Sequence, residues 1–396
     1  MRLQLLPIIF MVILNIAIDA RYFLLFRKYR SHQWLQHLYT ALSLLLIGVI
    51  VLAVAMPRRS IGDDGLRLIM WLLFGYFSFY IPKYFALITE GLFNLPRIFK
   101  KKAIRGSIIY SAIVGIVVFF SLWWGALFTR NAIDIKEVEI EFANLPYQFN
   151  GYRIVQFSDV HLGSYGSDTT YIGKVVDEIN RLQPNLICFT GDLVNRCTKE
   201  AMPFKNVLSR LYAPDGVLSI LGNHDYGDYM DWPTPEARTA NNKSMEKLQK
   251  EMGWHLMNNT DTIIRRGENR ICIIGVENWG EPPFPKYGKL SKAHHALNDK
   301  DFKILLSHNS KHWRGEVIPK SNIDLMLAGH THAMQIELNL WGLRLSPSAL
   351  RYKEWGGLYE QGLQKLYVNI GIGEVAIPMR LGAKPEITLI TLKRKQ

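Results

Sequence analysis

Four long apolar runs in the first third of the chain restrict its fold more than any other feature. They cover Leu3–Phe26, His37–Met56, Leu68–Ile88 and Ser107–Phe128. A helix needs about 20 predominantly apolar residues to cross a bilayer, and each run approaches or exceeds that length. The second and fourth runs carry no formal charge, whereas the first contains Asp19 and Arg21 and the third contains Lys83. We expect an N-terminal α-helical transmembrane bundle of about four helices within residues 1–130.

A cleaved signal peptide is the alternative for the first run. It would require a small-residue cleavage site followed by soluble sequence. Three further apolar runs follow instead, so we interpret the first run as a crossing.

The positive charge of the chain is concentrated in this apolar third. Residues 1–136 contain 16 Lys and Arg and 5 Asp and Glu, whereas the other 260 residues contain 31 and 29. The formal net charge of +13 therefore belongs mainly to the membrane region. The rest of the chain has no implied basic face of the kind that binds nucleic acid. We expect the bilayer as a partner and no nucleic acid.

The loops between the apolar runs predict the orientation. Eight basic residues lie on the first and third loops, and six lie on the opposite side of the membrane. The eight are Arg27, Lys28, Arg30, Arg97, Lys100, Lys101, Lys102 and Arg105. The positive-inside rule places these loops in the cytoplasm. Four crossings then place the segment after the fourth run outside the cytoplasm, in a multi-pass cell (inner) membrane protein.

Two groups of charges near the runs have two interpretations each. Lys100–Lys102 is either a topology signal or a site that attracts anionic headgroups, and we favour the topology signal. Lys83 and Glu90 lie two helical turns apart and could share a face, which would hint at function. We favour snorkelling to the membrane interface for this pair.

Five polar fragments distinguish the remaining two thirds of the chain. They are Asp159-Val160-His161, Gly191-Asp192, Gly222-Asn223-His224-Asp225, Ser307-His308-Asn309 and Gly329-His330-Thr331-His332. Each follows a short apolar run typical of a strand, namely Arg153–Phe157, Asn185–Phe189, Gly216–Leu221, Phe302–Leu306 and Ile323–Leu327. Strand ends at one sheet edge bring distant residues together, so we expect seven side chains to converge. These are Asp159, His161, Asp192, Asn223, His308, His330 and His332.

The composition of this set predicts a site for two divalent metals with one shared carboxylate. The side chains of residues i and i+2 of an extended chain point the same way. Asp159 with His161, and His330 with His332, should therefore each present two side chains to the same metal position. The glycines at 191, 222 and 329 should lie where the chain turns sharply or approaches closely. Imidazole and carboxylate together suit zinc, iron or manganese better than calcium.

Helices interleaved with these strands indicate an α/β layered domain. The predicted helices are Asp168–Leu182, Met202–Leu211 and Ser244–Met252. Further strands are predicted at Ala132–Ala143, Thr262–Arg265, Arg270–Val276, Leu366–Ile370 and Glu386–Leu392.

Two loops rich in aromatic residues and proline, Tyr226–Asn242 and Glu277–Tyr287, have three interpretations. They form a rim over the metals, rest on the bilayer surface, or are plain surface loops stiffened by proline. Three cysteines, Cys188, Cys197 and Cys272, form no CxxC pair, and we expect the first and last to be core residues.

The fragments DVH, GD, GNHD, a lone His and GHTH, in this order, resemble those of the calcineurin-like metallophosphoesterases. The resemblance covers about Glu137 to the C-terminus. It implies a phosphoesterase domain at residues 131–396, with an α/β four-layer β-sandwich and a dimetal site at the strand ends. One metal would take Asp159, His161, Asp192 and His332, and the other Asp192, Asn223, His308 and His330, with Asp192 bridging.

Two positions depart from the family's pattern. Many relatives read GDxxD, and their last Asp can steady the histidine of GNHD. Asn195 stands at that place here, which puts the proton-donating strength of His224 in doubt. The family often has glycines after GHTH, whereas Ala333 and Met334 follow here. We expect this change to affect local packing more than metal ligation.

The resemblance implies hydrolysis of a phosphate ester or pyrophosphate by a hydroxide bound to two divalent ions (Mn, Fe or Zn). His224 would donate a proton to the leaving oxygen, and Asp225 would either orient His224 or tie down its own loop. Membrane anchoring favours a lipid or lipid-linked phosphorylated substrate. The alternatives are a phosphodiesterase that acts on a soluble ester, with the helices as a tether, and a non-catalytic membrane binding or transport module.

Overall fold

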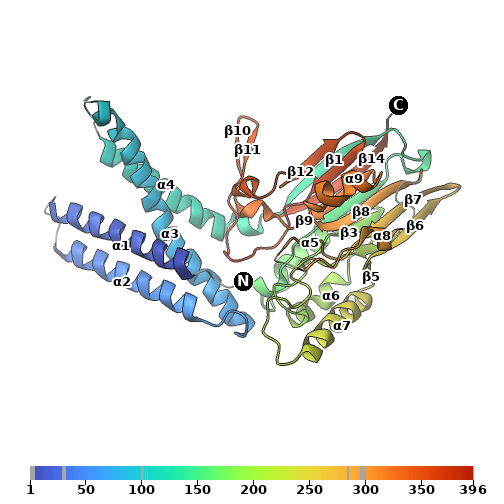
Figure 1. Ribbon diagram of the computed structural model, residues 1–396, viewed down its shortest axis with the longest axis horizontal. Coiled ribbons are helices and arrows are strands. Elements are labelled where there is room, and N and C mark those ends of the chain that lie inside the picture. The colour runs from blue at the N-terminus through green and yellow to red at the C-terminus, as the bar shows by residue number, and fades with distance from the viewer. Residues whose placement is uncertain are drawn as a thin grey trace. The chain divides into compact units, whose positions relative to one another are not determined.

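The computed structural model describes residues 5–28, 33–99, 102, 104, 106–282, 285–294 and 300–395. The chain divides into two compact units (Figure 1). The helical unit comprises Met1–Leu127 with Ala376–Met379, and the soluble unit comprises Phe128–Val375 with Arg380–Gln396. The expectations that involve Arg2, Arg30, Lys100, Lys101, Arg105, Pro283 and Phe284 lie outside the described residues.

The helical unit contains four long helices that follow the four apolar runs. They are α1 (Leu5–Lys28), α2 (Gln33–Ala55), α3 (Asp63–Asn94), which continues into a 3-10 turn at Leu95–Phe99, and α4 (Ser107–Leu127). Within the described residues, three stretches are long and apolar enough to cross a membrane: Gln33–Ala55, Asp63–Phe99 and Ser107–Asn131. Helix α1 is not among the three, so its crossing stays a prediction.

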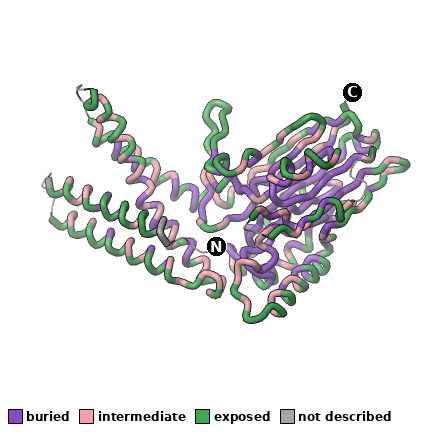
Figure 2. The backbone as a smooth tube through the Cα atoms, viewed as in Figure 1, coloured by how far each residue is buried: buried purple, intermediate pink, exposed green. Residues whose placement is uncertain are grey.

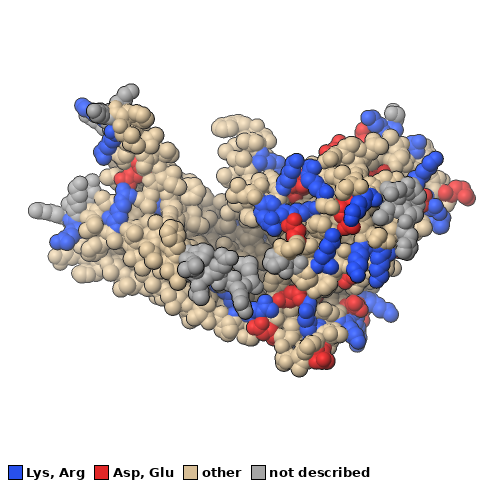
Figure 3. Space-filling model, viewed as in Figure 1, with Lys and Arg blue, Asp and Glu red and all other residues tan. Residues whose placement is uncertain are grey.

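Apolar side chains point outward from these helices. Leu44 and Phe120 are 63% and 65% exposed, respectively. Much of the backbone of the helical unit is exposed in Figure 2, and on the face drawn in Figure 3 most of this unit lacks charge. The buried face of α4 instead has small residues, including Ser111 and Gly115. A Cβ atom on Gly115 would lie 3.3 Å from the carbonyl oxygen of Pro82 on α3. Helix packing through small residues with apolar groups outside is the pattern of membrane-embedded helices.

Lys83 and Glu90 of α3 pair with α1 rather than with each other. Lys83 Nζ lies 2.5 Å from Asp19 Oδ1, and Glu90 Oε2 lies 2.7 Å from a guanidinium nitrogen of Arg21. The side chain of Lys83 is only 11% exposed, and its ammonium lies 3.8 Å from the ring centroid of Phe79. The snorkelling interpretation is therefore wrong for Lys83, because a carboxylate inside the bundle compensates its charge.

The soluble unit contains two six-stranded sheets and a separate hairpin, β10 (Leu338–Leu340) with β11 (Leu343–Leu345). The first sheet has the order β1 (Asp134–Phe142), β14 (Glu386–Arg394), β2 (Arg153–Phe157), β3 (Leu186–Phe189), β4 (Val217–Ser219), β5 (Trp254–Leu256). The second has the order β12 (Gly357–Gln361), β13 (Gln364–Val368), β9 (Leu325–Gly329), β8 (Phe302–Asn309), β7 (Asn269–Gly275), β6 (Thr260–Arg266). Strands β2 to β5 run parallel to one another, as do β7, β8, β9 and β13, whereas β14 is antiparallel to β2.

Alternate residues of the strands face different layers. Ile154 of β2 packs between the sheets with Ile304 of β8, whereas the adjacent Val155 packs with Val176 of α5. On the outer face of the second sheet, Met326 packs with Trp313. The helices of these outer layers are α5 (Thr170–Arg181), α6 (Lys205–Leu208), α7 (Pro235–Glu251), α8 (Leu290–Ala293) and α9 (Ile318–Lys320). The order helix, sheet, sheet, helix confirms the predicted four-layer α/β sandwich.

Two predicted segments differ from the structure. Helix α7 begins at Pro235, so the second half of the predicted loop Tyr226–Asn242 is helical. Thr234 caps this helix, since its side chain accepts a hydrogen bond from the amide of Ala237 at 3.2 Å, and proline is favoured at the first helical position. Of the predicted helix Met202–Leu211, only the single turn of α6 is α-helical, and its first three residues are the end of a 3-10 segment, Thr198–Phe204.

Candidate active site

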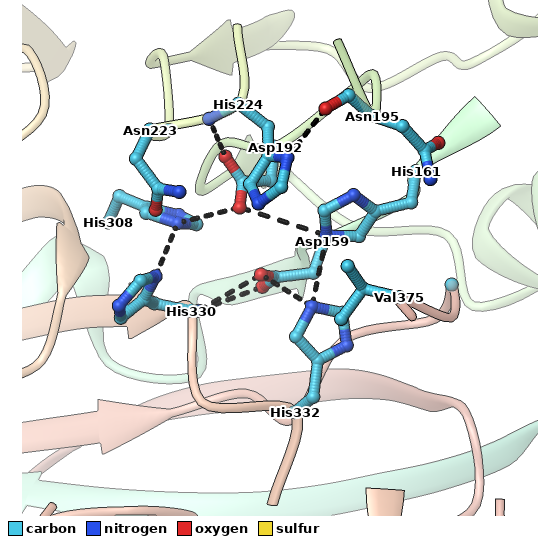
Figure 4. A network of polar contacts seen from close by, with 12 residues as sticks. Asp159, His161, Asp192, Asn195, Asn223, His224, His308, His330, His332 and Val375 are labelled. Carbon is cyan, nitrogen blue, oxygen red and sulfur yellow. Dashed lines mark hydrogen bonds and ion pairs between the residues drawn. The ribbon is translucent and has the colours of Figure 1, made fainter. Parts of the chain in front are cut away.

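Three of the five polar fragments follow strands β2, β3 and β4, the fourth forms the end of β8, and the fifth begins on the last residue of β9. The first three strands are parallel neighbours in one sheet, and the last two are parallel neighbours in the other. Parallel strands end at the same sheet edge, so their following loops meet there. The structure brings all seven predicted side chains, and His224, into one buried cluster (Figure 4).

The backbone of this cluster is not extended as the sequence suggested. Asp159 and His161 have φ angles of 53° and 49°, and His330 and His332 have 74° and 50°. The argument from residues i and i+2 is therefore wrong, although its result holds. Non-glycine residues in the left-handed region cost free energy and are held there by their surroundings.

Two glycines make this backbone possible. Gly191 has a φ of +96°. A Cβ atom on Gly329 would lie 2.3 Å from Asp159 Oδ2, so only glycine lets β9 end this close to the carboxylate. Ala333 and Met334, where the family often has glycines, have φ angles of 51° and 45°. The backbone at these two residues therefore has the left-handed conformation that glycine adopts without strain.

Two groups of three ligand-type side chains form the cluster. In the first, His332 Nε2 lies 3.2 Å from Asp159 Oδ1 and 3.0 Å from His161 Nε2. In the second, Asp192, His308 and His330 converge, and all donor atoms of each group lie within 4.8 Å of one another.

Asp192 lies between the two groups. Its Oδ2 atom is 3.1 Å from His308 Nε2 and 3.7 Å from His161 Nε2. Its other oxygen accepts a hydrogen bond from the amide of His224 at 2.8 Å, which fixes the carboxylate in this orientation. A carboxylate in this position can reach a cation held by either group.

Several donor atoms of the cluster have no protein partner that suits them. Asn223 Oδ1 is buried without a hydrogen-bond partner among the described residues, while its Nδ2 donates to the hydroxyl of Tyr229 at 2.9 Å. Two imidazole nitrogens, His330 Nδ1 and His308 Nε2, face each other at 3.2 Å. Buried polar atoms are rarely left unpaired. The set fits divalent cations with nitrogen and oxygen ligands.

Outer hydrogen bonds orient two of the histidines. His308 Nδ1 lies 2.8 Å from the carbonyl oxygen of Thr190, so it donates there and directs Nε2 toward the cluster. His330 Nε2 lies 3.0 Å from the hydroxyl of Tyr352. Such outer partners fix the tautomer and the ring plane of metal-binding histidines.

Mutual electrostatics keep the cluster's carboxylates ionised. Burial alone would raise the pKa of Asp192, but the nearby His308 and His224 lower it well below its usual range. Burial would lower the pKa of His308, yet Asp192 and Asp159 raise it to about 9. Burial and the proximity of His308 lower the pKa of His330 to about 3. The two aspartates thus attract positive charge, which protons or metal cations can supply.

His224 is held by the backbone of the residue that departs from the family's pattern. Its Nδ1 lies 2.6 Å from the carbonyl oxygen of Asn195. The Asn195 side chain donates instead to the hydroxyl of Ser164, at 3.1 Å. The His224 ring also stacks on Tyr229, with centroids 4.2 Å apart. His224 therefore has an orienting partner without a carboxylate at position 195.

Asp225 ties down loops and does not orient His224. Its carboxylate accepts hydrogen bonds from the amides of Gly222, Asp192, Leu193 and Val194 at 2.9 to 3.2 Å. Of the two roles that the sequence left open, the structure shows the second. These bonds join the loop after β3 to the loop after β4, and so position Asp192 and Asn223 relative to each other.

A pocket of about 170 Å³ opens beside the second ligand group. The two loops rich in aromatic residues contribute Tyr229 and Glu281 to its lining, so both form part of the rim. Lys311 and Arg351 both contact Glu281, at 2.8 Å and 3.1 Å. The lining residues are Asn223, Tyr229, Asn278, Gly280, Glu281, Asn309, His330, Arg351 and Tyr352.

Three residues near the site were not identified from the sequence. Arg351 and Tyr352 line the pocket but belong to no motif. The fully buried guanidinium of Arg380 donates to the carbonyl oxygens of Gly373 and Ala383 and lies 3.3 Å from His332 Nδ1. Only tertiary structure brings these side chains to the site.

Comparison with known proteins supports this description. The profile of the family described as Calcineurin-like phosphoesterase matches residues 152–334. The uncharacterized metallophosphoesterase YkuE of Bacillus subtilis is 33% identical over 269 residues, which cover 66% of this chain and 86% of YkuE. A transmembrane protein with metallophosphoesterase domain from Danio rerio is 29% identical over 272 residues, 66% of this chain and 57% of that protein. UDP-2,3-diacylglucosamine pyrophosphatase LpxG of Chlamydia trachomatis is 42% identical over 91 residues, 22% of this chain and 27% of LpxG.

Proposed function

Because the chain belongs to the calcineurin-like metallophosphoesterases, enzymes that hydrolyse phosphoester bonds, we propose a specific role within that family. The protein is a membrane-anchored dimetal phosphohydrolase that cleaves a phosphate ester or pyrophosphate of a lipid or lipid-linked substrate. The observation that carries the proposal is the position of Asp192, 3.1 Å from His308 and 3.7 Å from His161. A carboxylate shared by two groups of imidazoles is suited to a pair of cations.

The ligands divide into two sets that share Asp192. One cation is held by Asp159, His161, Asp192 and His332, and the other by Asp192, Asn223, His308 and His330. Nitrogen and oxygen donors of this kind suit Mn, Fe or Zn. Two such cations, when bound, make water nucleophilic near neutral pH and neutralise charge on the phosphate oxygens.

His224 supplies the proton to the leaving oxygen. Its Nδ1 donates to the carbonyl oxygen of Asn195 at 2.6 Å, which leaves Nε2 as the atom that carries the transferable proton. Stacking on Tyr229 holds the ring plane. General acid catalysis of this type is worth about a hundredfold to ten-thousandfold in rate.

The pocket rim binds a second anionic group of the substrate. Lys311 and Arg351 share the single carboxylate of Glu281, so one positive charge is left over beside the pocket. A guanidinium is a strong partner for phosphate. A pyrophosphate, or a phosphate with a charged headgroup, places such an anion next to the phosphoryl group at the metals.

Two features favour a lipid substrate over a soluble one. The helical unit contains three stretches that can span a membrane, and LpxG, whose name gives a diacylated sugar nucleotide as substrate, matches 91 residues of the chain. We therefore place the substrate at the bilayer surface, with its phosphate in the pocket.

The soluble unit lies outside the cytoplasm in this proposal. The loop between α3 and α4 has five basic residues, which favour the cytoplasmic side. Helix α4 then carries the chain to the other side, whether or not α1 crosses the membrane. Reporter fusions at the C-terminus test this: a reporter active only outside the cytoplasm should be active, and activity of a cytoplasm-only reporter would refute the orientation.

The full-length chain in lipid nanodiscs, loaded with Mn²⁺, tests the function. We expect hydrolysis of UDP-2,3-diacylglucosamine with a higher kcat/KM than that of the soluble ester bis(p-nitrophenyl) phosphate. Equal or better turnover of the soluble ester would favour the tether alternative. Bound metal without turnover of any ester would favour the non-catalytic module.

A further inference from the structure

A second cluster of metal-ligand side chains lies on the outer face of the second sheet. Asp261 is on β6, Cys272 is on β7, and His294 directly follows α8. One donor atom from each lies within 4.8 Å of the other two. None of these residues belongs to the five fragments that form the phosphoesterase site.

The sheet register brings the three side chains together. Cys272 pairs with Ile263 across the antiparallel strands, so Asp261, two residues before Ile263, projects from the same face as Cys272. Helix α8 covers this face, and its Leu290 and Ala293 pack in the same core cluster as Cys272. The end of α8 therefore delivers His294 beside the thiol.

The two distances from the Cys272 sulfur resemble the edges of a tetrahedral zinc site. Cys272 Sγ lies 3.7 Å from Asp261 Oδ2 and 3.9 Å from His294 Nδ1, and the same two atoms of Asp261 and His294 form an ion pair. Zinc–ligand bonds of 2.0–2.3 Å at tetrahedral angles give ligand–ligand distances of about 3.3–3.8 Å. Asp261 Oδ2 and His294 Nδ1 lie closer together than such an edge, so these two atoms would move apart to admit an ion.

A catalytic thiol does not explain the arrangement. His294 faces both Cys272 and Asp261 with the same nitrogen, Nδ1, whereas a cysteine–histidine–aspartate relay uses both ring nitrogens. Cys272 is also only 2% exposed, too buried to meet a substrate.

The surrounding charges permit a cation. Lys303 pairs with Cys272 across β7 and β8, but its ammonium donates to the carbonyl oxygen of Asp301 at 3.0 Å and to Asn322 Oδ1 at 3.1 Å. The side chain of Asp261 is 39% exposed, so an ion can enter from solvent and keep water as a fourth ligand.

We propose that Asp261, Cys272 and His294 bind a zinc-class divalent cation at a site separate from the phosphoesterase centre. The thiolate selects a borderline-soft ion such as Zn²⁺ over Mg²⁺ or Ca²⁺. The site ties β6, β7 and the end of α8 together, so it stabilises the outer layer of the second sheet.

Cobalt substitution tests this site without measuring activity. The phosphoesterase centre has only nitrogen and oxygen donors, so a thiolate-to-Co²⁺ charge-transfer band in the near ultraviolet can arise only from a cysteine. We expect the full-length protein loaded with Co²⁺ to show this band. Cys272→Ser and His294→Ala should lose it while retaining the metal at the other centre, and the control Cys197→Ser should keep it.

Metal counting gives the second readout. Mass spectrometric metal analysis of the zinc-loaded protein should show one more Zn²⁺ per chain than the Cys272→Ser variant. Should these variants fail to fold, the band must still appear in the unmodified protein and persist in Cys197→Ser for the proposal to stand. Absence of the band when the phosphoesterase centre is filled, or its loss in Cys197→Ser, would overturn the proposal and leave a plain His–Asp ion pair beside a buried thiol.

Discussion

His224 Nδ1 lies 2.6 Å from the backbone carbonyl oxygen of Asn195. The side chain at position 195, by contrast, makes its hydrogen bond to Ser164. The amide at position 195, where many relatives have a carboxylate, therefore does not leave His224 without an orienting partner. The backbone carbonyl oxygen of Asn195 orients the His224 ring.

This contact predicts unequal effects of two substitutions. His224→Ala should reduce kcat about a hundredfold to ten-thousandfold, the usual contribution of a positioned proton donor. Asn195→Ala should reduce it much less, because the carbonyl oxygen remains. Steady-state kinetics with metal analysis checks both, and both variants should keep their metals. Metal loss in His224→Ala would mean that His224 is a ligand.

The pocket rim predicts a change in substrate binding. Arg351→Ala should raise KM for a pyrophosphate substrate about tenfold, the lower end of what a hydrogen bond between charged groups contributes, because this side chain is 55% exposed. The value of kcat should change less than KM, because Arg351 holds the substrate's second anionic group and not the phosphoryl group at the metals. Arg270→Ala, which removes an exposed ion pair with Asp301, is the control and should leave KM unchanged.

The buried ion pair of the helical unit predicts a loss of stability. Lys83→Ala leaves Asp19 unpaired in the bundle interior, and breaking a buried pair costs about 3–5 kcal/mol. Asp19→Leu combined with Lys83→Met should cost less than Lys83→Ala alone, because no charge is left uncompensated. Thermal unfolding in detergent micelles measures this. The control Arg67→Ala breaks an exposed pair with Asp64 and should reduce the free energy of unfolding by about 1 kcal/mol or less. An equally small reduction for Lys83→Ala would refute the role of burial.

A buried glutamate predicts pH-dependent stability. Burial raises the pKa of Glu374 to about 7, although Arg130 and Arg380 act against the shift. The native state then binds a proton more tightly than the unfolded state, whose pKa is near 4.5. Its stabilising contribution is complete below pH 4.5 and is lost as pH rises toward 7, by about 3 kcal/mol at most.

Glu374→Gln removes this titration. Urea unfolding between pH 5 and 8 should show a flatter pH dependence for this variant than for the unmodified protein. Glu139→Gln, at a side chain that is 68% exposed, should leave the dependence as it was. A profile of Glu374→Gln that parallels the unmodified protein would show that Glu374 does not titrate in this range.

The sequence predicts the parts of this protein that depend on local patterns. Strand β2 has the predicted limits, Arg153–Phe157, because a short apolar run between polar fragments leaves little choice. The seven ligand-type residues are predictable because each follows such a strand. The extended backbone assumed for Asp159 and His161 was wrong, since the left-handed angles result from the close approach of neighbouring loops.

The remaining features depend on tertiary structure. Tyr352 and Arg380 approach the site from segments without a motif, and no local pattern connects them with His330 or His332. The pairing of Lys83 with Asp19 likewise joins residues 64 positions apart. The start of α7 was predictable in principle, because Thr234 and Pro235 form a helix N-terminal signal.

Metal analysis of the purified Asp192→Ala variant most directly tests the central claim that one carboxylate joins two cations. Asp192 Oδ2 faces His308 and His161 at 3.1 Å and 3.7 Å, so its removal should lower the metal content of the phosphoesterase centre and abolish hydrolysis. A variant that folds and binds as much metal as the unmodified protein would contradict the account.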